Sequence, residues 1–368
     1  MTEIPPRVML TEYKSQIDTP ALLIDQDAME SNIALMAGYF EKFPVGLRPH
    51  FKTHKSPILA HKQLDAGAIG ITCAKLTEAE VLVHAGIKDI LIANQIVGPS
   101  KTMRLACLAR HANLLVAVDN EKNIRELSSA AEGAGSMLRV LVEVNVGHER
   151  CGVEPGEAVV RLAQLVERLP GLRFAGVLGY EGHAVFIPER EERQKAVDRA
   201  MARLILAVEH LREAGIAVEI VSAGGTGTYD MVSRIPGLTE VVAGSYILMD
   251  TKYRDIGLPF RCALTLLATV ISVPAPKRAV IDAGKKVITT ENGLPEVLSP
   301  RGVKLISLHE EHGILEVGPD STGVQIGDKV ELVPSHVCTT VNLHDWFYAI
   351  RGHRVEAIWP ITARGKAQ

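Results

Sequence analysis

Short apolar runs alternate with longer, periodically apolar segments between about residue 45 and residue 250. The short runs are typical of β-strands, whereas segments in which Leu, Ala and Val recur every three or four positions with charges between them predict amphipathic helices. We expect strands at residues 46–52, 68–74, 89–94, 113–119, 138–146, 173–180, 218–223 and 240–248. Helices are expected between them, for example at residues 77–85, 100–110, 156–167 and 190–214.

This alternation predicts an α/β fold. Near-continuous apolar strands joined by helical crossovers indicate a parallel sheet that is covered by helices. Eight such units over roughly 200 residues fit a closed (β/α)8 TIM-type barrel, and an open, doubly wound sheet is the alternative. After about residue 258, strand-like runs follow one another with only Pro- and Gly-containing turns between them, which predicts a C-terminal β-rich domain.

We place the barrel at residues 26–257 and the β-rich domain at residues 1–25 and 258–368. The N-terminal segment joins the second domain because residues 19–25 form a further strand-like run that can pair with the C-terminal strands. Residues 26–39 then predict a helix with Asp25 as its N-cap. Strands of the second domain are expected at residues 262–273, 278–282, 304–308, 313–317, 329–333, 346–350 and 354–361.

Charge and composition exclude several classes of partner. The net charge is −3 over 368 residues and the basic residues are dispersed, so we expect no nucleic-acid partner. The sequence contains no apolar run of the roughly 20 residues that would span a bilayer and has no signal-peptide pattern at its start, which predicts no membrane partner and a cytoplasmic location. Five widely spaced cysteines argue against a disulfide framework.

Residues that could take part in catalysis or binding follow several of the predicted strands. Catalytic groups of (β/α)8 barrels lie at the carboxyl-terminal ends of the strands. Lys52 ends the first strand in a crowded polar setting, where a lysine can be a covalent anchor. The seventh strand ends in a Gly- and Thr-rich turn that includes Gly225 and Thr226, and the eighth ends in Gly244-Ser245-Tyr246. Loops after these two strands commonly bind phosphate, although such a turn can also be a simple tight connection.

A lysine beside a phosphate site indicates either a sugar phosphate held as a Schiff base or pyridoxal 5'-phosphate. Two further residues at strand ends favour the cofactor. Arg150, after the fifth strand, can donate to a pyridine nitrogen, and Tyr180, after the sixth, can pack beside the ring. The alternative for Arg150 is an ion pair with Glu149 or Glu143.

A second group of polar residues lies in the β-rich domain, around His336 and Cys338. In an extended segment residues i and i+2 point to the same side, so both side chains can reach one metal ion, with His344 or Asp345 nearby. Two protein ligands would leave coordination positions for water and substrate, as catalytic metals require. The alternative is an ordinary polar loop.

Five motifs in order, spread over essentially the whole chain, resemble a known family. They are Arg-Pro-His-x-Lys-x-His-Lys, Val-Gly-x-x-Arg-Cys-Gly-Val, Gly-Gly-Thr-Gly-Thr, Ala-Gly-Ser-Tyr-x-x-Met-Asp and Pro-Ser-His-Val-x-x-Thr-x-Asn-Leu-His-Asp. The sequence resembles the metal-activated D-threonine aldolase and D-serine dehydratase group, which are fold-type III, alanine racemase-like pyridoxal-phosphate enzymes.

The resemblance implies a homodimer that uses pyridoxal 5'-phosphate and a divalent metal (Mn, Mg or Zn). It assigns the Schiff base to Lys52 and a catalytic metal contact to His336. It assigns cofactor contacts to the residues Lys52, Arg150, Tyr180, Gly225, Thr226, Gly244, Ser245 and Tyr246, and metal binding to His336 and Cys338.

The resemblance also implies a reaction on a D-3-hydroxyamino acid. We expect carbon–carbon cleavage of the D-threonine aldolase type, giving glycine and an aldehyde. The alternative is β-elimination by a D-serine or 3-hydroxy-D-aspartate dehydratase, because Cys338 stands where the aldolase pattern has an aspartate. An amino-acid racemase or a non-catalytic pyridoxal-phosphate-binding protein is a remote alternative. A thiolate ligand would favour a softer ion such as Zn.

Overall fold

Eight parallel strands form one sheet in the computed structural model, which describes residues 11–321 and 323–368. Their order is β2-β9-β8-β7-β6-β5-β4-β3. An isolated parallel bridge between His50 and Thr72 joins the two ends of this order, so the strands close into the predicted barrel. The strands are β2 (Gly46–Leu47), β3 (Ile71–Cys73), β4 (Asp89–Gln95), β5 (Asn113–Val118), β6 (Leu138–Glu143), β7 (Leu172–Gly179), β8 (Ile220–Ala223) and β9 (Glu240–Val241).

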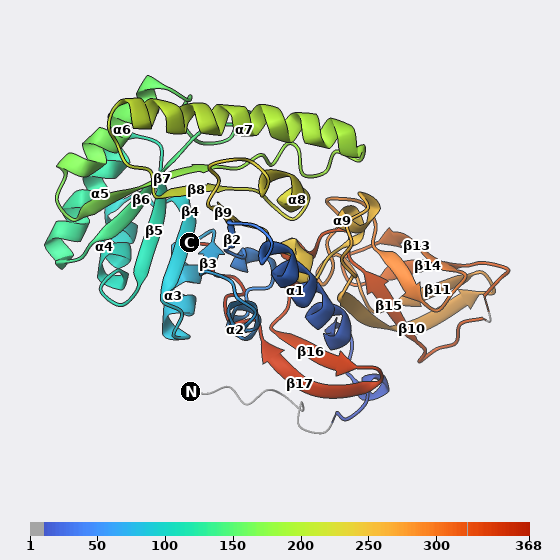
Figure 1. Ribbon diagram of the computed structural model, residues 1–368. Helices are drawn as coiled ribbons and strands as arrows, with labels where there is room; N and C mark the ends of the chain where they lie inside the picture. The colour runs from blue at the N-terminus through green and yellow to red at the C-terminus, as the bar shows by residue number, and fades with distance from the viewer. Residues whose placement is uncertain (1–10, 322) are drawn as a thin grey trace. The chain divides into compact units, whose positions relative to one another are not determined.

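Helices follow the strands and cover the outside of this sheet (Figure 1). Their local signals agree with the sequence: Asn120 caps α5 by accepting a hydrogen bond from the Asn123 amide at 2.9 Å, and Gly135 ends it at a φ of 61°, a left-handed conformation that suits glycine. The helices are α2 (Pro57–Asp65), α3 (Leu76–His84), α4 (Pro99–Leu108), α5 (Glu121–Ala134), α6 (Glu157–Arg168), α7 (Arg190–Glu213) and α8 (Tyr229–Val232).

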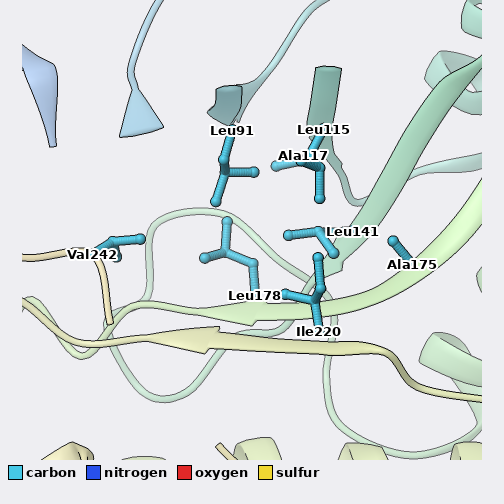
Figure 2. Packing of buried hydrophobic residues seen from close by; sticks show 8 residues of the cluster. All are labelled: Leu91, Leu115, Ala117, Leu141, Ala175, Leu178, Ile220 and Val242. Atoms are coloured by element: carbon cyan, nitrogen blue, oxygen red, sulfur yellow. The ribbon is translucent and has the colours of Figure 1, made fainter. Parts of the chain in front are cut away.

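Apolar side chains from β4 to β8, together with one from just after β9, fill the space that the strands enclose (Figure 2). Aliphatic residues of different size interdigitate there, as expected for the packed interior of such a barrel. The cluster consists of Leu91, Leu115, Ala117, Leu141, Ala175, Leu178, Ile220 and Val242, with none more than 7% exposed.

Several predicted strands are shorter than expected, and the difference is largest for the first and the last strand of the barrel. The first strand ends at Leu47, and the segment Phe51–Thr53 is a 3-10 turn. Pro49 has no amide hydrogen to donate to a neighbouring strand, which favours an early end. The last strand ends at Val241 and is followed by a second 3-10 turn, Ser245–Ile247. The prediction that these strands continue to residues 52 and 248 is therefore wrong, because residues 48–50 and 242–244 lie outside the regular strands and residues 51–53 and 245–247 form 3-10 turns.

The remaining strands form a nine-stranded, largely antiparallel sheet. The prediction that residues 19–25 pair with C-terminal strands is confirmed, because β1 pairs antiparallel with β10 and parallel with β16. The strands are β1 (Ala21–Asp25), β10 (Leu264–Ala275), β11 (Arg278–Ile281), β12 (Glu296–Ser299), β13 (Val303–Leu308), β14 (Gly313–Val317), β15 (Lys329–Val333), β16 (Trp346–Arg351) and β17 (Arg354–Pro360). Between them lie the short helices α9 (Thr251–Asp255) and α10 (Val337–Val341).

Asp25 acts at the start of helix α1 (Gln26–Phe40) as expected, because its carboxylate accepts a hydrogen bond from the Ala28 amide at 3.0 Å. The chain divides into two compact units. The barrel unit comprises residues 35–52, 57–244 and 366–368, and the described part of the β-rich unit comprises residues 11–34, 53–56, 245–321 and 323–365. The boundaries expected from the sequence, at residues 26 and 257, stay predictions, and residues 1–10 of the expected N-terminal segment lie outside the described residues. No helix in the described ranges is both long and apolar enough to cross a membrane.

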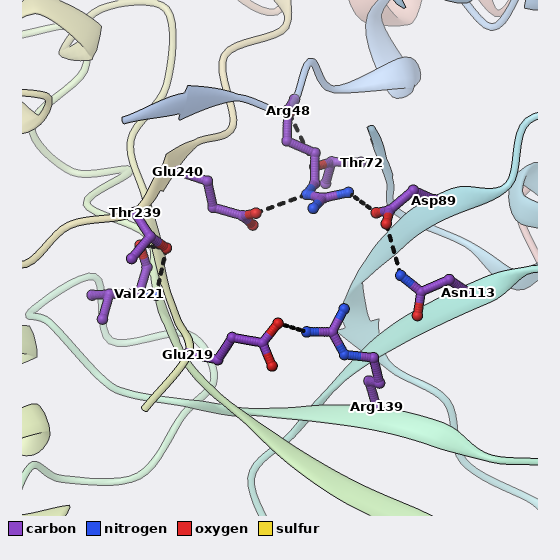
Figure 3. Close-up of polar contacts among 9 residues, drawn as sticks. All are labelled: Arg48, Thr72, Asp89, Asn113, Arg139, Glu219, Val221, Thr239 and Glu240. Atoms are coloured by element: carbon purple, nitrogen blue, oxygen red, sulfur yellow. Dashed lines mark hydrogen bonds and ion pairs between the residues drawn. The ribbon is translucent and has the colours of Figure 1, made fainter. Parts of the chain in front are cut away.

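Charged side chains connect the residue that follows β2 to the first residues of β9 and β4 (Figure 3). The guanidinium of Arg48 donates to Glu240 at 2.9 Å and also pairs with Asp89. The side chains of Arg48 and Glu240 are only 5% and 2% exposed. A buried pair of this kind leaves an uncompensated charge when one partner is removed.

We therefore expect Arg48→Leu to destabilise the fold by about 3–5 kcal/mol, because Glu240 would remain buried without its partner. Urea denaturation followed by far-ultraviolet circular dichroism measures the loss. Arg125→Leu is the control, since Arg125 forms an ion pair in which both side chains are 56% exposed, and such pairs contribute less than about 1 kcal/mol. Adding Glu240→Leu to Arg48→Leu should recover part of the stability; equal stability of Arg48→Leu and Arg125→Leu would contradict this account.

Candidate functional site

Lys52 lies in the 3-10 turn Phe51–Thr53 that follows β2, where its side chain is half-buried. Its backbone amide donates to Nδ1 of His50 at 3.4 Å, which supports the turn. Its Nζ lies 5.9 Å from the centroid of the Tyr180 ring, which follows β7. A cation at this distance from an aromatic face is attracted by the ring, so Lys52 points towards Tyr180.

Arg150 approaches the same ring from the loop after β6. Its Cζ lies 5.5 Å from the Tyr180 centroid. Among the described residues it forms no ion pair with Glu143 or Glu149, the two partners that the alternative interpretation required. Arg150 is exposed, so its guanidinium is accessible to a ligand at this end of the barrel.

Tyr180 also packs against the Gly-rich turn after β8. A Cβ atom added to Gly225 would lie 3.3 Å from a ring carbon of Tyr180. A Cβ atom on Gly182 would lie 2.6 Å from the same ring and 2.8 Å from His148, closer than real side chains approach. Glycine is therefore required at residue 182 for this packing. Tyr180 thus lies next to Lys52, Arg150 and the turn after β8. The predicted cofactor site requires this arrangement.

Two histidines that the sequence prediction missed also lie here. The His148 ring lies edge-on to Tyr180 with a centroid distance of 5.7 Å, and it stacks with His183 at 6.1 Å. Burial and the charge of Arg150 lower the pKa of His148, and burial lowers the pKa of His183. Both follow strand ends in the sequence, and that position is the signal that could have identified them.

Hydrogen bonds of the Thr228 side chain stabilise the turn after β8. The Thr228 hydroxyl donates to Glu181 and accepts a hydrogen bond from the Gly225 amide at 3.2 Å, so neither group is directed at a ligand. The Thr228 hydroxyl therefore supports the turn and is not directed at a phosphate. Thr226, at the tip of the turn, is 2% exposed.

The other predicted phosphate turn begins at Gly244, the last residue of the second segment of the barrel unit. Ser245 and Tyr246 begin the 3-10 turn Ser245–Ile247, which belongs to the β-rich unit. The Ser245 carbonyl accepts the Met249 amide at 2.7 Å, and the Tyr246 ring packs near Phe260 with a centroid distance of 5.8 Å. These contacts fix the turn within the β-rich unit.

His336 and Cys338 do not lie in an extended segment. His336 is the N-cap of helix α10 (Val337–Val341), with φ −147° and ψ 116°, and Cys338 is in the first helical turn. The helix forms because the buried Asp250 carboxylate accepts the Val337 amide at 3.0 Å. The argument from strand geometry is therefore wrong. The imidazole and the thiol nevertheless interact, because the Cys338 side chain raises the pKa of His336.

Acidic groups surround His336. Its Nδ1 lies 2.7 Å from a carboxylate oxygen of Glu291, which also accepts the Thr339 hydroxyl. Burial disfavours the charged imidazole, but the side chains of Cys338, Asp250 and Glu291 outweigh it and raise the pKa of His336 to about 9. The sequence prediction missed Glu291 because 45 residues separate it from His336. This part of the β-rich unit therefore favours a positive charge.

The other two candidates for the metal site have different partners. Nε2 of His344 lies 2.7 Å from the Val287 carbonyl, and Asp345 accepts a hydrogen bond from Arg364 at 2.7 Å. The Cys338 thiol instead lies 3.5 Å from the Thr53 hydroxyl, and Thr53 directly follows Lys52 in the chain. Within the described ranges, the structure contains no group of three or more His, Cys, Asp or Glu side chains arranged to hold a metal ion.

Family models match both parts of the chain. Residues 24–252 match the model "Alanine racemase, N-terminal domain" and residues 263–350 match the model "Putative serine dehydratase domain". The chain is 41% identical to the D-threonine aldolase of Arthrobacter sp. over 366 residues, which cover 98% of this chain and 97% of that protein.

Solved structures give the same result. The crystal structure of the D-threonine aldolase from Filomicrobium marinum matches with a TM-score of 0.95 and 40% identity, over 97% of this chain and 99% of that one. The D-threo-3-hydroxyaspartate dehydratase from Delftia sp. HT23 matches with a TM-score of 0.87 and 30% identity, over 95% of this chain and 99% of that one. The chain belongs to the D-threonine aldolase and D-serine dehydratase family of alanine racemase-like, fold-type III proteins.

Proposed function

We propose that this protein is a pyridoxal 5'-phosphate- and divalent-metal-dependent lyase that acts on D-3-hydroxyamino acids. Its main reaction is the retro-aldol cleavage of a D-threonine-type substrate to glycine and an aldehyde. The observation that carries the proposal is the convergence of Lys52, Arg150 and Gly225 on the ring of Tyr180. The similarity to D-threonine aldolases over nearly the whole chain supports the choice of reaction.

The barrel residues fit pyridoxal phosphate. Lys52 offers a primary amine for the aldehyde, Arg150 offers a donor for the pyridine nitrogen, and Tyr180 offers an aromatic face beside them. The absence of a side chain at Gly225 lets the turn after β8 lie against Tyr180. We assign the phosphate to this turn through Thr226, and to Gly244, Ser245 and Tyr246 after β9.

The donors around His336 fit a divalent ion. An imidazole and a thiol are ligands that suit zinc and similar metals, and the acidic neighbours that raise the pKa of His336 equally favour a metal cation. We assign His336 and Cys338 as ligands, and Glu291 as the carboxylate that orients the imidazole at 2.7 Å. Hydrogen bonds from neighbouring carboxylates commonly orient metal-binding histidines in this way.

The proposed roles follow from the bonds that must break. Bound pyridoxal phosphate supplies an electron sink that stabilises negative charge at the substrate α-carbon. Retro-aldol cleavage requires the β-hydroxyl to lose its proton as the Cα–Cβ bond breaks, and His336 and Cys338 would hold the ion that makes this hydroxyl more acidic. Lys52 would hold the cofactor. In β-elimination, Lys52 would instead accept the α-proton.

β-Elimination is the second candidate because of Cys338. A solved relative, a cysteine-to-alanine variant of D-threo-3-hydroxyaspartate dehydratase, is a metal-free form at 30% identity to this chain. The aldolases are more similar to this chain, at 41% and 40% identity. We therefore keep carbon–carbon cleavage as the main reaction. A homodimer and a cytoplasmic location are also part of the proposal.

Replacing Lys52 should abolish attachment of the cofactor. We expect Lys52→Ala to lose the visible absorbance of bound pyridoxal phosphate and at least about 1,000-fold in activity, because no other group replaces its amine. Absorbance titration of the purified protein measures this. Lys122→Ala, which removes an exposed lysine of the barrel unit, is the control. An unchanged spectrum in Lys52→Ala would refute the cofactor assignment.

Product analysis separates the two reactions. The metal-loaded holoenzyme should convert D-threonine to glycine and acetaldehyde, because cleavage of the Cα–Cβ bond yields these two fragments. Pyruvate and ammonia from D-serine, without glycine from D-threonine, would instead identify β-elimination as the reaction. Chromatographic identification of the products makes the distinction, and L-threonine is the control substrate.

The metal assignment is tested apart from the cofactor. We expect His336→Ala to weaken binding of Zn²⁺ or Mn²⁺ at least about tenfold, because one of two ligands is removed, while pyridoxal phosphate still binds with its normal spectrum. Calorimetric titration of the metal-free protein measures the affinity. His312→Ala, at an exposed histidine of the same unit, is the control. Full activity after chelation would remove the metal from the mechanism.

A further inference from the structure

Glu181 is a buried acid that contacts the turn to which we assign the phosphate. It follows Tyr180 in sequence and is 0% exposed. The described part of the chain gives its carboxyl group no ion pair. A carboxyl group without a cation is costly to bury, so its neighbours should explain its presence.

Both oxygens of this carboxyl group bind the turn. One accepts the Gly224 amide at 3.1 Å, and the other accepts the Thr228 hydroxyl at 2.5 Å. Thr228 in turn accepts the Gly225 amide at 3.2 Å. Glu181 therefore reaches two successive amides of the turn, one directly and one through Thr228. These bonds hold both ends of the segment from Gly224 to Thr228.

The backbone of the turn needs this support. Gly224 has a φ of 89°, in the left-handed region that side chains disfavour. Gly227 passes so close to the Val185 carbonyl that an added Cβ atom would lie 2.1 Å from its oxygen. Gly224 and Gly227 allow the unfolded chain many other conformations here. Buried hydrogen bonds are therefore required to stabilise the conformation of the folded turn.

The charge of Glu181 also matters for an anionic ligand. An ionised carboxylate behind the turn would repel a phosphate group. Burial raises the pKa of Glu181, and the hydrogen bonds from Thr228 and Gly224 offset this only in part. The surroundings thus shift the group towards the neutral acid, which would donate its proton to Thr228 while the Thr228 hydroxyl donates to the Gly225 carbonyl at 3.4 Å. Glutamine has the shape of the neutral acid, and it can accept from Gly224 while donating to Thr228.

We propose that Glu181 is the positioning residue of the phosphate site, which fixes the turn from Gly224 to Thr228 so that its tip, Thr226 and Gly227, receives the phosphate of the cofactor. The inference rests on the proposed function, since it assumes that this turn binds the phosphate. Glu181 acts through the turn, by occupying the amides of Gly224 and Gly225, and makes no contact with the cofactor itself.

The test compares two probes, pyridoxal 5'-phosphate and pyridoxal, which differ only in the phosphate group. We expect Glu181→Ala in the full chain to weaken the first at least about tenfold, because the turn loses two buried hydrogen bonds. Affinity for pyridoxal should stay within about twofold. Glu181→Gln should restore the affinity for pyridoxal 5'-phosphate to within about threefold of the wild type. Equilibrium dialysis against the cofactor-depleted protein measures both affinities.

Two further variants keep the test decisive. Thr228→Val preserves the shape of the side chain and removes only the hydroxyl that connects Gly225 to Glu181. It should show the same selective loss of affinity for pyridoxal 5'-phosphate, and it takes the place of Glu181→Ala in the test if that variant does not fold. Glu240→Ala removes another buried acid, at 2% exposure, and should lower stability without changing the ratio of the two affinities. If Glu181→Ala loses affinity for both probes equally, the positioning role of Glu181 is refuted, while the assignment of the phosphate site is not. A wild type that binds both probes equally would overturn the phosphate site itself.

Discussion

The parallel direction of the eight barrel strands is the constraint on which the proposed cofactor site depends. Because every strand of a closed parallel sheet ends at the same side, residues that follow different strands meet there. Lys52 follows β2, Arg150 follows β6 and Gly225 follows β8, yet all three lie around the ring of Tyr180. An open sheet would have separated β2 from β3, whereas the bridge between His50 and Thr72 closes the ring.

The sequence predicted this arrangement because helical crossovers between consecutive apolar strands indicate that the strands run parallel and thus end at the same side. The first and last strands were predicted too long, since apolar character alone does not distinguish a strand from a buried turn such as Ser245–Ile247. The contacts of Glu181 and Glu291 could not be predicted. They depend on side-chain packing between segments that are 47 and 48 residues apart, as in the pairs Glu181–Thr228 and Glu291–Thr339.

The same limit explains the error at His336. Its sequence neighbours indicated an extended segment, but the Val337 amide donates to the buried carboxylate of Asp250, 87 residues from Val337, and helix α10 starts there. Asp250 also accepts the Tyr253 amide at 3.0 Å as the N-cap of α9. One carboxylate therefore starts two short helices. The side chains of His336 and Cys338 interact, but the backbone geometry that was assumed for them was wrong.

Acidic side chains serve two different purposes in the two units. Near His336, the side chain of Cys338 and the acids Asp250 and Glu291 outweigh the effect of burial and together raise the pKa of the imidazole to about 9. Glu181 has no such cation among the described residues, and burial raises the pKa of the acid instead. An acid that favours a cation suits a metal site, whereas an acid held towards its neutral form can support a turn that receives an anion. The surroundings of the carboxyl groups therefore differ between the two regions. Those near His336 suit a metal ion, and those of Glu181 suit a phosphate group.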